Sequence, residues 1–254
     1  MLAFISCAKT MAAQNRLSVP FLTEPVCQNE ATQHALELSR YSAEELMKLL
    51  KVNDKIAAEN WLRFQNFCSA DAETLPALCA YTGQVFKRIA VKDFTEADWR
   101  FAQDHLRISS FIYGLLRPLD GIRPYRLEGD VRLAMHDGKT MFESWRDRLT
   151  DAFIADIQQQ GGILLNIASA EMMGLFHWKK VEESVRVITP EFLVRKGSQL
   201  KVVTVYAKMC RGEMTRFFLK NRFDDSEALK AFEWEGFRFS SADSTENEWR
   251  FVNG

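Results

Sequence analysis

The chain has 254 residues, of which 47% are hydrophobic and 26% are charged, a composition typical of globular proteins with a substantial core. Lys and Arg number 33 against 34 Asp and Glu. This balance excludes a protein coated in basic charge, so any nucleic-acid binding must come from a local patch.

Five cysteines without C-x-x-C spacing, and the absence of a recognisable signal peptide, predict reduced thiols in a cytoplasmic protein. The longest apolar run is far shorter than the ~20 residues that span a bilayer. We therefore expect no membrane partner.

The first segments predict a strand followed by a loop. Residues 1–6 form a short apolar run, and Lys9-Thr10 follow at its carboxyl end. A Lys-Thr pair after a strand also occurs in phosphate loops, but the glycines of that motif are missing here, so a surface lysine in a turn is the simpler interpretation. Residues 11–29 have little periodicity and predict a loop.

Capping residues predict the next helices. A helical pattern begins at Glu30, Ser42 opens a capping box for a helix through Leu50, and Asn53 or Asp54 caps another helix. The last of these is expected to turn Ile56, Ala57, Trp61, Leu62 and Phe64 toward the core. The pair of short helices could form a helix-turn-helix or a helix-hairpin-helix, or else an ordinary helical corner, which is commoner.

The middle of the chain predicts a strand, a helix and then a long irregular segment. Residues 81–89 predict a strand bent at Gly83, and Thr95 caps a helix. Residues 109–133 are too rich in Gly and Pro for a long helix. Their arginines are Arg117, Arg123, Arg126 and Arg132. These arginines could recognise phosphate or planar groups. Simple pairing with neighbouring carboxylates, such as Asp120, Glu128 and Asp130, explains them equally well.

The second half predicts a helix from Thr140 to the Gly161-Gly162 pair and a central strand at 163–167. Strands at 186–188 and 200–206 follow, with a hairpin turn at 196–198. A short helix or turn at 228–232 and edge strands at 235–239 and 248–252 complete the chain. We expect one domain over residues 1–254 of the α+β class, with a mixed sheet.

Residues 203–222 are the stretch around which we expect a site. They are predicted to open as a strand, break at 208–212 and continue as a basic helix. A strand that leads through Lys208 and Arg211 into a helix start predicts an anion site, because the first N–H groups of a helix are unpaired.

Polar residues follow three predicted strands, and strand ends are the usual place for a site. They are Ser6 and Lys9; Asn166, Ser169 and Glu171; and Tyr206, Lys208 and Arg211. An enzyme could use Glu171 as general base, Lys9 or Lys208 as an amine, and Tyr206 as a donor.

Metal and thiol chemistry have weaker signals. The histidines are scattered, at His34, His105, His136 and His177, so no metal is expected. Cys7 and Cys210 lie beside the basic strand ends and could sense oxidants if their pKa were lowered, although small buried thiols are the commoner explanation.

Several motifs together resemble the peroxide-stress YaaA family of bacteria. They are ISCAKT at 5–10, IYGLLRPLDGIRPYRLE at 112–128, NIASAE at 166–171, YAKMCRGEMTRFFLKNR at 206–222 and EGFRF at 235–239. The resemblance implies a cytosolic DNA-binding protein that limits free intracellular iron during hydrogen peroxide stress. It also implies a barrel-like sheet around a helix, a basic cleft and a helix-hairpin-helix element.

The resemblance places that element at 49–64, within a helical insertion at about 42–67, with Lys51, Lys55 and Arg63 as phosphate contacts and Ala58 where the family has a hairpin glycine. Cys7 stands where the family usually has Pro. Residues that agree with the family pattern are Lys9, Arg117, Pro118, Tyr125, Arg126, Asn166, Ser169, Glu171, Tyr206, Lys208, Arg211 and Gly212.

The first hypothesis is therefore a monomeric DNA-binding stress protein without cofactor, which prefers distorted or partly single-stranded DNA. Phosphates would lie on Lys9, Arg117, Arg126, Lys208, Arg211 and Arg216, and a base would stack on Tyr125 or Tyr206. The pocket would comprise Ser6, Thr10, Tyr125, Asn166, Ser169, Glu171, Tyr206 and Gly212. The alternative is an enzyme acting on a nucleobase or nucleotide with Glu171 as acid or base, and direct iron binding is a third idea.

Overall fold

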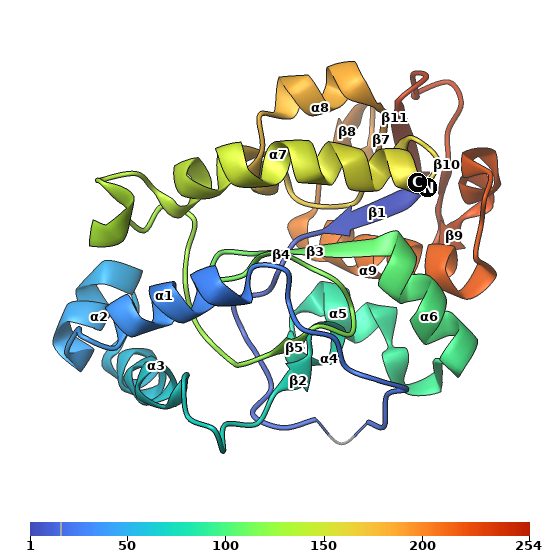
Figure 1. The fold of residues 1–254 in the computed structure, drawn as a ribbon. Coiled ribbons are helices and arrows are strands. Elements are labelled where there is room, and N and C mark those ends of the chain that lie inside the picture. Colours follow the sequence, from blue (N-terminus) through green and yellow to red (C-terminus); the bar gives the residue numbers. More distant parts are fainter. Residues whose placement is uncertain (16) are drawn as a thin grey trace.

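The computed structural model describes residues 1–15 and 17–254. A mixed sheet lies between two layers of helices (Figure 1). The strands are β1 (Leu2–Ile5), β2 (Leu75–Pro76), β3 (Leu106–Ser110), β4 (Gly114–Leu116), β5 (Gly121–Ile122), β6 (Ile163–Asn166), β7 (Arg186–Lys196), β8 (Gln199–Lys201), β9 (Glu233–Trp234), β10 (Phe237–Phe239) and β11 (Glu248–Asn253).

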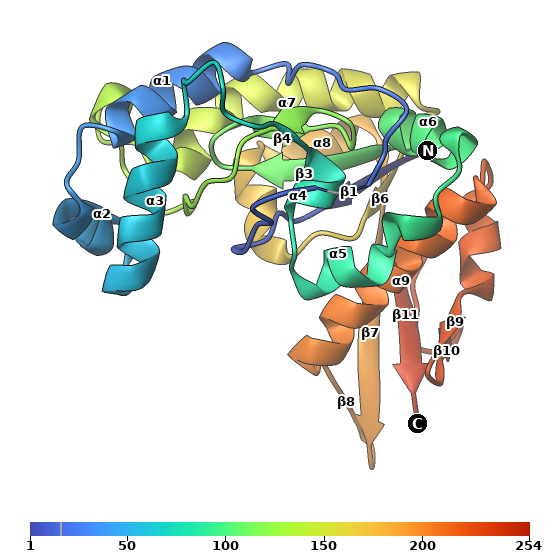
Figure 2. The same cartoon turned by 90° about the horizontal axis from the view of Figure 1, so that it is seen from below.

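The α-helices are α1 (Gln28–Leu38), α2 (Ala43–Leu50), α3 (Asp54–Asn66), α4 (Ala77–Ala80), α5 (Gln84–Ile89), α6 (Glu96–His105), α7 (Met141–Gln159), α8 (Trp178–Ser184) and α9 (Thr204–Asn221). Short 3-10 helices are η1 (Val91–Asp93), η2 (Ala134–His136), η3 (Ala170–Leu175) and η4 (Ser226–Ala231). Helices α7 and α8 cover one face of the sheet, and α5, α6 and α9 pack on the other (Figures 1 and 2).

The main sheet has the strand order β4-β3-β1-β6-β7-β11-β10-β9, with β8 paired to β7. Strands β3, β1, β6, β7 and β11 are parallel to their neighbours within this run, and β4, β8, β9 and β10 pair antiparallel. The predicted mixed α+β architecture is confirmed. Over the part of the chain that the structure describes, the two ends of the order do not pair, so the sheet is open and not a closed barrel.

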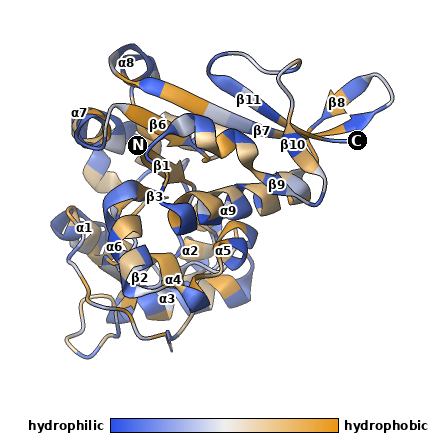
Figure 3. Cartoon of the chain, turned by 90° about the vertical axis from the view of Figure 1, so that its right-hand side faces the viewer, coloured by the Kyte–Doolittle hydropathy of each residue, from blue (hydrophilic) through white to orange (hydrophobic). Residues whose placement is uncertain are grey.

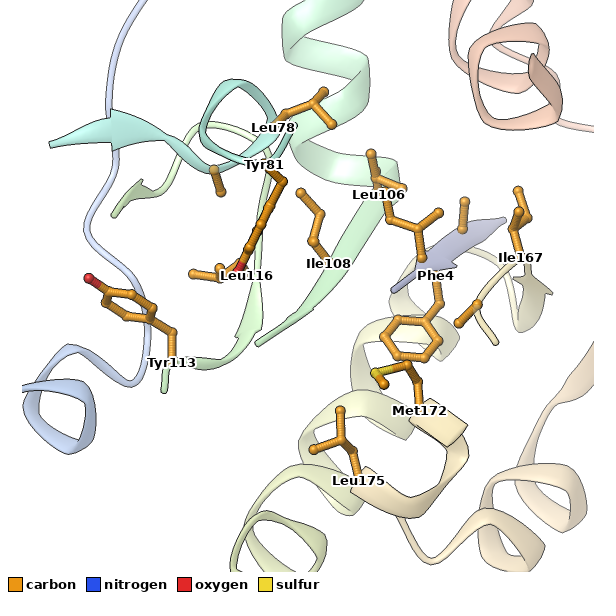
Figure 4. Packing of buried hydrophobic residues seen from close by; sticks show 14 of the residues in the cluster. Phe4, Leu78, Tyr81, Leu106, Ile108, Tyr113, Leu116, Ile167, Met172 and Leu175 are labelled. Atoms are coloured by element: carbon orange, nitrogen blue, oxygen red, sulfur yellow. The ribbon is translucent and has the colours of Figure 1, made fainter. Parts of the chain in front are cut away.

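Strand β1 lies at the centre because its side chains are apolar on both faces. All four of its residues are fully buried, and Phe4 packs its ring 5.3 Å from that of Phe153 on α7. Met172 and Leu175 of η3 extend the same core beneath Phe4 (Figure 4). The predicted strands at 1–6 and at 163–167 are confirmed, because runs of mainly apolar side chains suit positions that are covered on both faces.

The predicted helix starts are confirmed at the capping residues. Ser42, Thr95 and Thr140 each form a complete capping box, and the Asn53 side chain caps α3. The expected core face of α3 is only partly right. Ala57 and Phe64 are buried, whereas Trp61 is 37% and Leu62 54% exposed, because α3 buries only the stripe at helical spacing from Ala57.

Two predicted strands are helices. Residues 84–89 form α5 after Gly83, and Tyr81 contributes only an isolated bridge to Met11. The run 200–206 is divided between the short β8 and the start of α9 at Thr204. Its β-branched residues favour a strand locally, but tertiary packing of α9 against α5 overrides that weak preference.

This correction changes the predicted anion site. Lys208 and Arg211 lie inside α9, beyond its first turn, so they do not sit at a strand-to-helix junction and unpaired N–H groups cannot explain them. In addition, β11 is not an edge strand, since it pairs with both β7 and β10.

The helical pair α2 and α3 is joined by Lys51, Val52 and Asn53, and Lys51 adopts the left-handed conformation with φ 52°. Ala58 lies in the middle of α3. The expectation that Ala58 occupies a hairpin position requiring positive φ is therefore wrong, because that conformation belongs to Lys51.

The predicted loop 11–29 ends where α1 begins at Gln28, and its position 16 lies outside the described residues. No helix of the described residues is long and apolar enough to cross a membrane.

Candidate functional site

A cavity of about 410 Å³ opens at the carboxyl ends of β1 and β6, beneath one side of α9. The predicted site residues that line it are Ser6, Lys9, Thr10, Tyr125, Arg126, Ser169, Glu171, Lys208 and Arg211. The loops after β1 and β6 meet here as predicted, whereas Lys208 and Arg211 reach the cavity from helix α9 and not from a strand end. Parallel strands direct their carboxyl ends to one edge of a sheet, which is why these loops meet.

Hydrogen bonds hold the loops that form the cavity floor. Ser6 Oγ accepts from the Ser169 backbone N–H at 2.9 Å and lies 3.1 Å from Ser169 Oγ. Ser109 on β3 accepts from the Cys7 N–H through its Oγ, at 2.9 Å. The ends of β1, β3 and β6 are therefore tied directly to one another, which makes a rigid base for a site.

The cationic groups of the cavity fall into two sets. Arg126 Nε lies 2.6 Å and Lys9 Nζ 3.2 Å from the carboxylate of Glu128, so these two cations share one carboxylate partner. Lys208 and Arg211 form no ion pair with any of residues 1–15 and 17–254, and burial lowers the pKa of Arg211. Lys208 and Arg211 are consequently the two cations of the cavity whose charge no carboxylate of the described residues offsets.

Aromatic rings supply the apolar wall. Tyr125, Phe86 and Phe111 line the cavity. The Tyr125 hydroxyl lies 2.9 Å from that of Tyr81 and 2.7 Å from Ser110 Oγ, and burial raises the pKa of Tyr125. Its hydroxyl is therefore committed to the core, and only its ring is available to a ligand.

Several predicted site residues have structural partners instead. Arg117 pairs with the fully buried Asp120 at 2.9 Å, and Arg216 pairs with Asp93 at 2.6 Å while donating to the Ala90 carbonyl. Neither arginine lines the cavity. Each guanidinium is held by a carboxylate of its own, which leaves little of it free for a phosphate.

Three other predicted pocket residues also lie off the cavity. Asn166 is buried at the end of β6, where it donates to Thr189 Oγ1 at 3.3 Å. Tyr206 is 45% exposed on the first turn of α9. Gly212 lies where α9 crosses α5.

The predicted hairpin contacts Lys51, Lys55 and Arg63 are not part of the cavity. Lys51 Nζ lies 2.5 Å from Asp130, and Arg63 Nη2 lies 2.6 Å from Glu59. Lys55 is exposed on the first turn of α3.

Sequence reasoning missed part of the wall. Phe86, with Gln84 and Val85, comes from α5, which had been predicted as a strand. The usable signal was the three-residue spacing of Phe86 and Ile89 after Gly83, which is helical. The sequence suggested Glu128 only as a partner for the loop arginines, and it does pair with Arg126.

We expect Gly212→Ala to lower the free energy of unfolding by about 2 kcal/mol, since overpacking a close contact typically costs 1–3 kcal/mol. A Cβ at Gly212 would lie 2.3 Å from the Val85 carbonyl oxygen and 2.6 Å from Arg88 Cβ. Urea denaturation measures the loss. Gly121→Ala is the matched control, because its Cβ would come no closer than 3.4 Å to Thr74. Equal stability of the two variants would contradict the close α5–α9 approach.

We expect Cys7 to react slowly with thiol reagents at neutral pH. Burial raises the pKa of Cys7 to about 11, a shift that the hydrogen bond to Ser109 only partly offsets. Alkylation by iodoacetamide at pH 7.5 should be roughly 100-fold slower than for a free thiol of pKa ~8.5 and should accelerate toward pH 11. Mass spectrometry can follow Cys7 beside the exposed Cys68. Burial also raises the pKa of Cys210, to about 12, so neither thiol has the lowered pKa that an oxidant sensor needs. Alkylation of Cys7 as fast as that of Cys68 would contradict this conclusion.

Among the residues that the structure describes, no three His, Cys, Asp or Glu side chains are grouped so that they could hold a metal ion. His34 Nε2 and His136 Nε2 lie 2.8 Å apart, but His34 Nδ1 donates to the Ile112 carbonyl. That arrangement makes the pair a hydrogen bond between neutral imidazoles.

Comparison with known proteins assigns the chain to a family. The family model described as "Peroxide stress protein YaaA" matches residues 1–243. A UPF0246 protein of Bacteroides fragilis is 57% identical over 254 residues, covering 100% of this chain and 99% of its own length. The UPF0246 protein of Phocaeicola vulgatus is 56% identical over 99% of this chain and 98% of its own, and that of Clostridium beijerinckii is 36% identical over 99% and 97%. The chain therefore belongs to the peroxide stress protein YaaA family.

Proposed function

We propose that the protein acts in the peroxide-stress response by binding DNA, with one unpaired nucleotide of a distorted or single-stranded segment held in the cavity. One observation carries the proposal. Lys208 and Arg211, which have no carboxylate partner among the described residues, line the same cavity as the aromatic rings described above. Phosphate oxygens suit the cations, and every base offers a face to an aromatic ring.

The size of the cavity supports a single nucleotide more than a duplex surface. Its volume of about 410 Å³ lies within the roughly 300–1,000 Å³ of small-ligand sites. A base inside a stacked duplex shows no face to such a cavity, and extracting it costs a few kcal/mol. Pre-existing bubbles, gaps or damaged pairs remove that cost, so they should be preferred.

The surroundings of the cavity suggest secondary contacts. Lys55 on α3 is exposed, and Lys51 in the α2–α3 turn forms an exposed pair with Asp130, so both lysines could meet a flanking phosphate. We further propose that the stress role consists in limiting iron-driven oxidation of DNA, as the family resemblance implies.

The test is a titration of the protein into labelled intact duplex, bubbled duplex and single strand at two salt concentrations. We expect tighter binding to the bubble and the single strand than to the intact duplex. We also expect the affinity to fall as the salt concentration rises, because the Lys and Arg side chains displace counterions from the DNA phosphates. Equal affinity for intact and bubbled duplex, or no binding at all, would overturn the proposal.

A second candidate is an enzyme acting on a nucleobase or nucleotide, favoured by Glu171. This carboxylate lines the same cavity and forms no ion pair with any described residue. Glu171→Gln separates the two candidates. Loss of turnover of a bound nucleotide would support general acid–base chemistry, whereas unchanged or tighter DNA binding is expected of a simple phosphate binder that loses a nearby negative charge.

A further inference from the structure

The β7–β8 hairpin and the start of α9 form a basic strip next to the cavity. Figures 2 and 3 show the end of β7 with β8 projecting beyond the helical layers. The segment 192–212 contains no Asp or Glu, although acids slightly outnumber bases over the whole chain. Its cations are Arg195, Lys196, Lys201, Lys208 and Arg211.

Most side chains of this strip are exposed. Residues 195–199, 201–202 and 204–206 are all exposed to solvent, and Val202 and Tyr206 are 61% and 45% exposed. Arg195 pairs with Asp243 at 2.9 Å. Lys196 and Lys201 pair with no carboxylate of the described residues. The hairpin therefore offers two free ammonium groups beside exposed apolar and aromatic surface.

The strip is continuous with the cavity. Strand β8 ends at Lys201 and α9 begins at Thr204, so the backbone leads from Lys201 over a few residues to Lys208, which lines the cavity. With a helical rise of ~1.5 Å and an extended rise of ~3.3 Å per residue, Lys201 and Lys208 lie within roughly 15 Å of each other. That span matches a few nucleotides of an extended strand.

We propose that the β7–β8 hairpin binds the single-stranded DNA that flanks the nucleotide in the cavity. Lys196 and Lys201 contact its phosphates, and Tyr206 stacks on one of its bases. This inference rests on the DNA-binding function proposed above and adds the direction in which the strand leaves the cavity. Charge complementarity favours a polyanion, and an exposed tyrosine between lysines suits unpaired bases in particular.

The experiment compares Lys196→Ala/Lys201→Ala with wild type on a labelled dinucleotide, which is too short to reach from the cavity to the hairpin, and on a labelled 15-nucleotide single strand. Fluorescence anisotropy is read at several salt concentrations. The matched control is Lys139→Ala/Lys179→Ala, since Lys139 lies before α7 and Lys179 on α8, away from the hairpin. Thermal melting checks that each variant is folded.

For the long strand, loss of two phosphate contacts should reduce the slope of log affinity against log salt by ~1.4. Dinucleotide binding should stay at the wild-type level, the control should keep the wild-type slope, and Lys196→Arg/Lys201→Arg should restore it. A wild-type slope in the alanine variant overturns the hairpin contact while leaving the cavity proposal intact. If wild-type protein binds neither the dinucleotide nor the long strand, the proposed function fails, and the hairpin inference fails with it.

Discussion

The double variant Lys208→Ala/Arg211→Ala is expected to bind single-stranded or bubbled DNA roughly 100-fold more weakly than wild type. Hydrogen bonds to charged groups contribute about 1.5 kcal/mol or more each, so losing two costs ~3 kcal/mol. Both side chains come from one face of α9 and line the cavity. Neither pairs with a carboxylate of residues 1–15 and 17–254, so their removal breaks no internal ion pair.

Fluorescence anisotropy with a bubbled duplex measures this loss. The matched control is Arg40→Ala/Lys139→Ala, which also removes one arginine and one lysine, from positions that are exposed and away from the cavity. The control should bind like wild type, and both variants should melt at the wild-type temperature. A double variant that keeps wild-type affinity would show that the cavity is not where DNA binds.

The features that could be predicted from the sequence are those encoded locally. The capping boxes at Ser42, Thr95 and Thr140 require only residues three positions apart, and the buried strands follow from apolar runs of strand length. The convergence of Lys9, Glu171 and other strand-end residues follows from the direction of parallel strands. These rules need no knowledge of distant contacts.

The features that were missed depend on tertiary contacts. The strand-like residues before Tyr206 become helical because α9 packs closely on α5 through Gly212. Arg216 is removed from the site by Asp93, which lies 123 residues earlier in the chain. Arg117 differs, because its partner Asp120 is three residues away, and this pairing was one of the two explanations that the sequence left open.

The end of α9 is held by another tertiary contact, to Asp98 on α6. Asp98 is 2% exposed, and its carboxylate lies 2.9 Å from Lys220 Nζ and 2.7 Å from Arg222 Nη2. It also accepts from the Thr95 N–H at 2.9 Å, completing the capping box of α6. One carboxylate therefore links the start of α6 to the end of α9, the helix that carries Lys208.

We expect Asp98→Asn to lower the free energy of unfolding at pH 7 by about 3 kcal/mol, the lower end of the 3–5 kcal/mol for breaking a buried ion pair. The lower end applies because the side chains of Lys220 and Arg222 are 29% and 44% exposed and can rehydrate. Urea denaturation measures the change. Asp104→Asn, an exposed position on the same helix, should have little effect.

The pH dependence tests the physical cause of this loss. Burial alone would raise the pKa of Asp98, but the bonds from Lys220, Thr95 and Arg222 outweigh it and hold the pKa well below its usual value. A depressed folded-state pKa stabilises the protein above the unfolded value of ~3.9, and that stabilisation is lost as the pH falls below it. The stability difference between wild type and Asp98→Asn should therefore be full at pH 7 and shrink steadily between about pH 4 and pH 2. A difference that stays constant over this range would mean that packing or hydrogen bonding, and not the charge of Asp98, holds α9 in place.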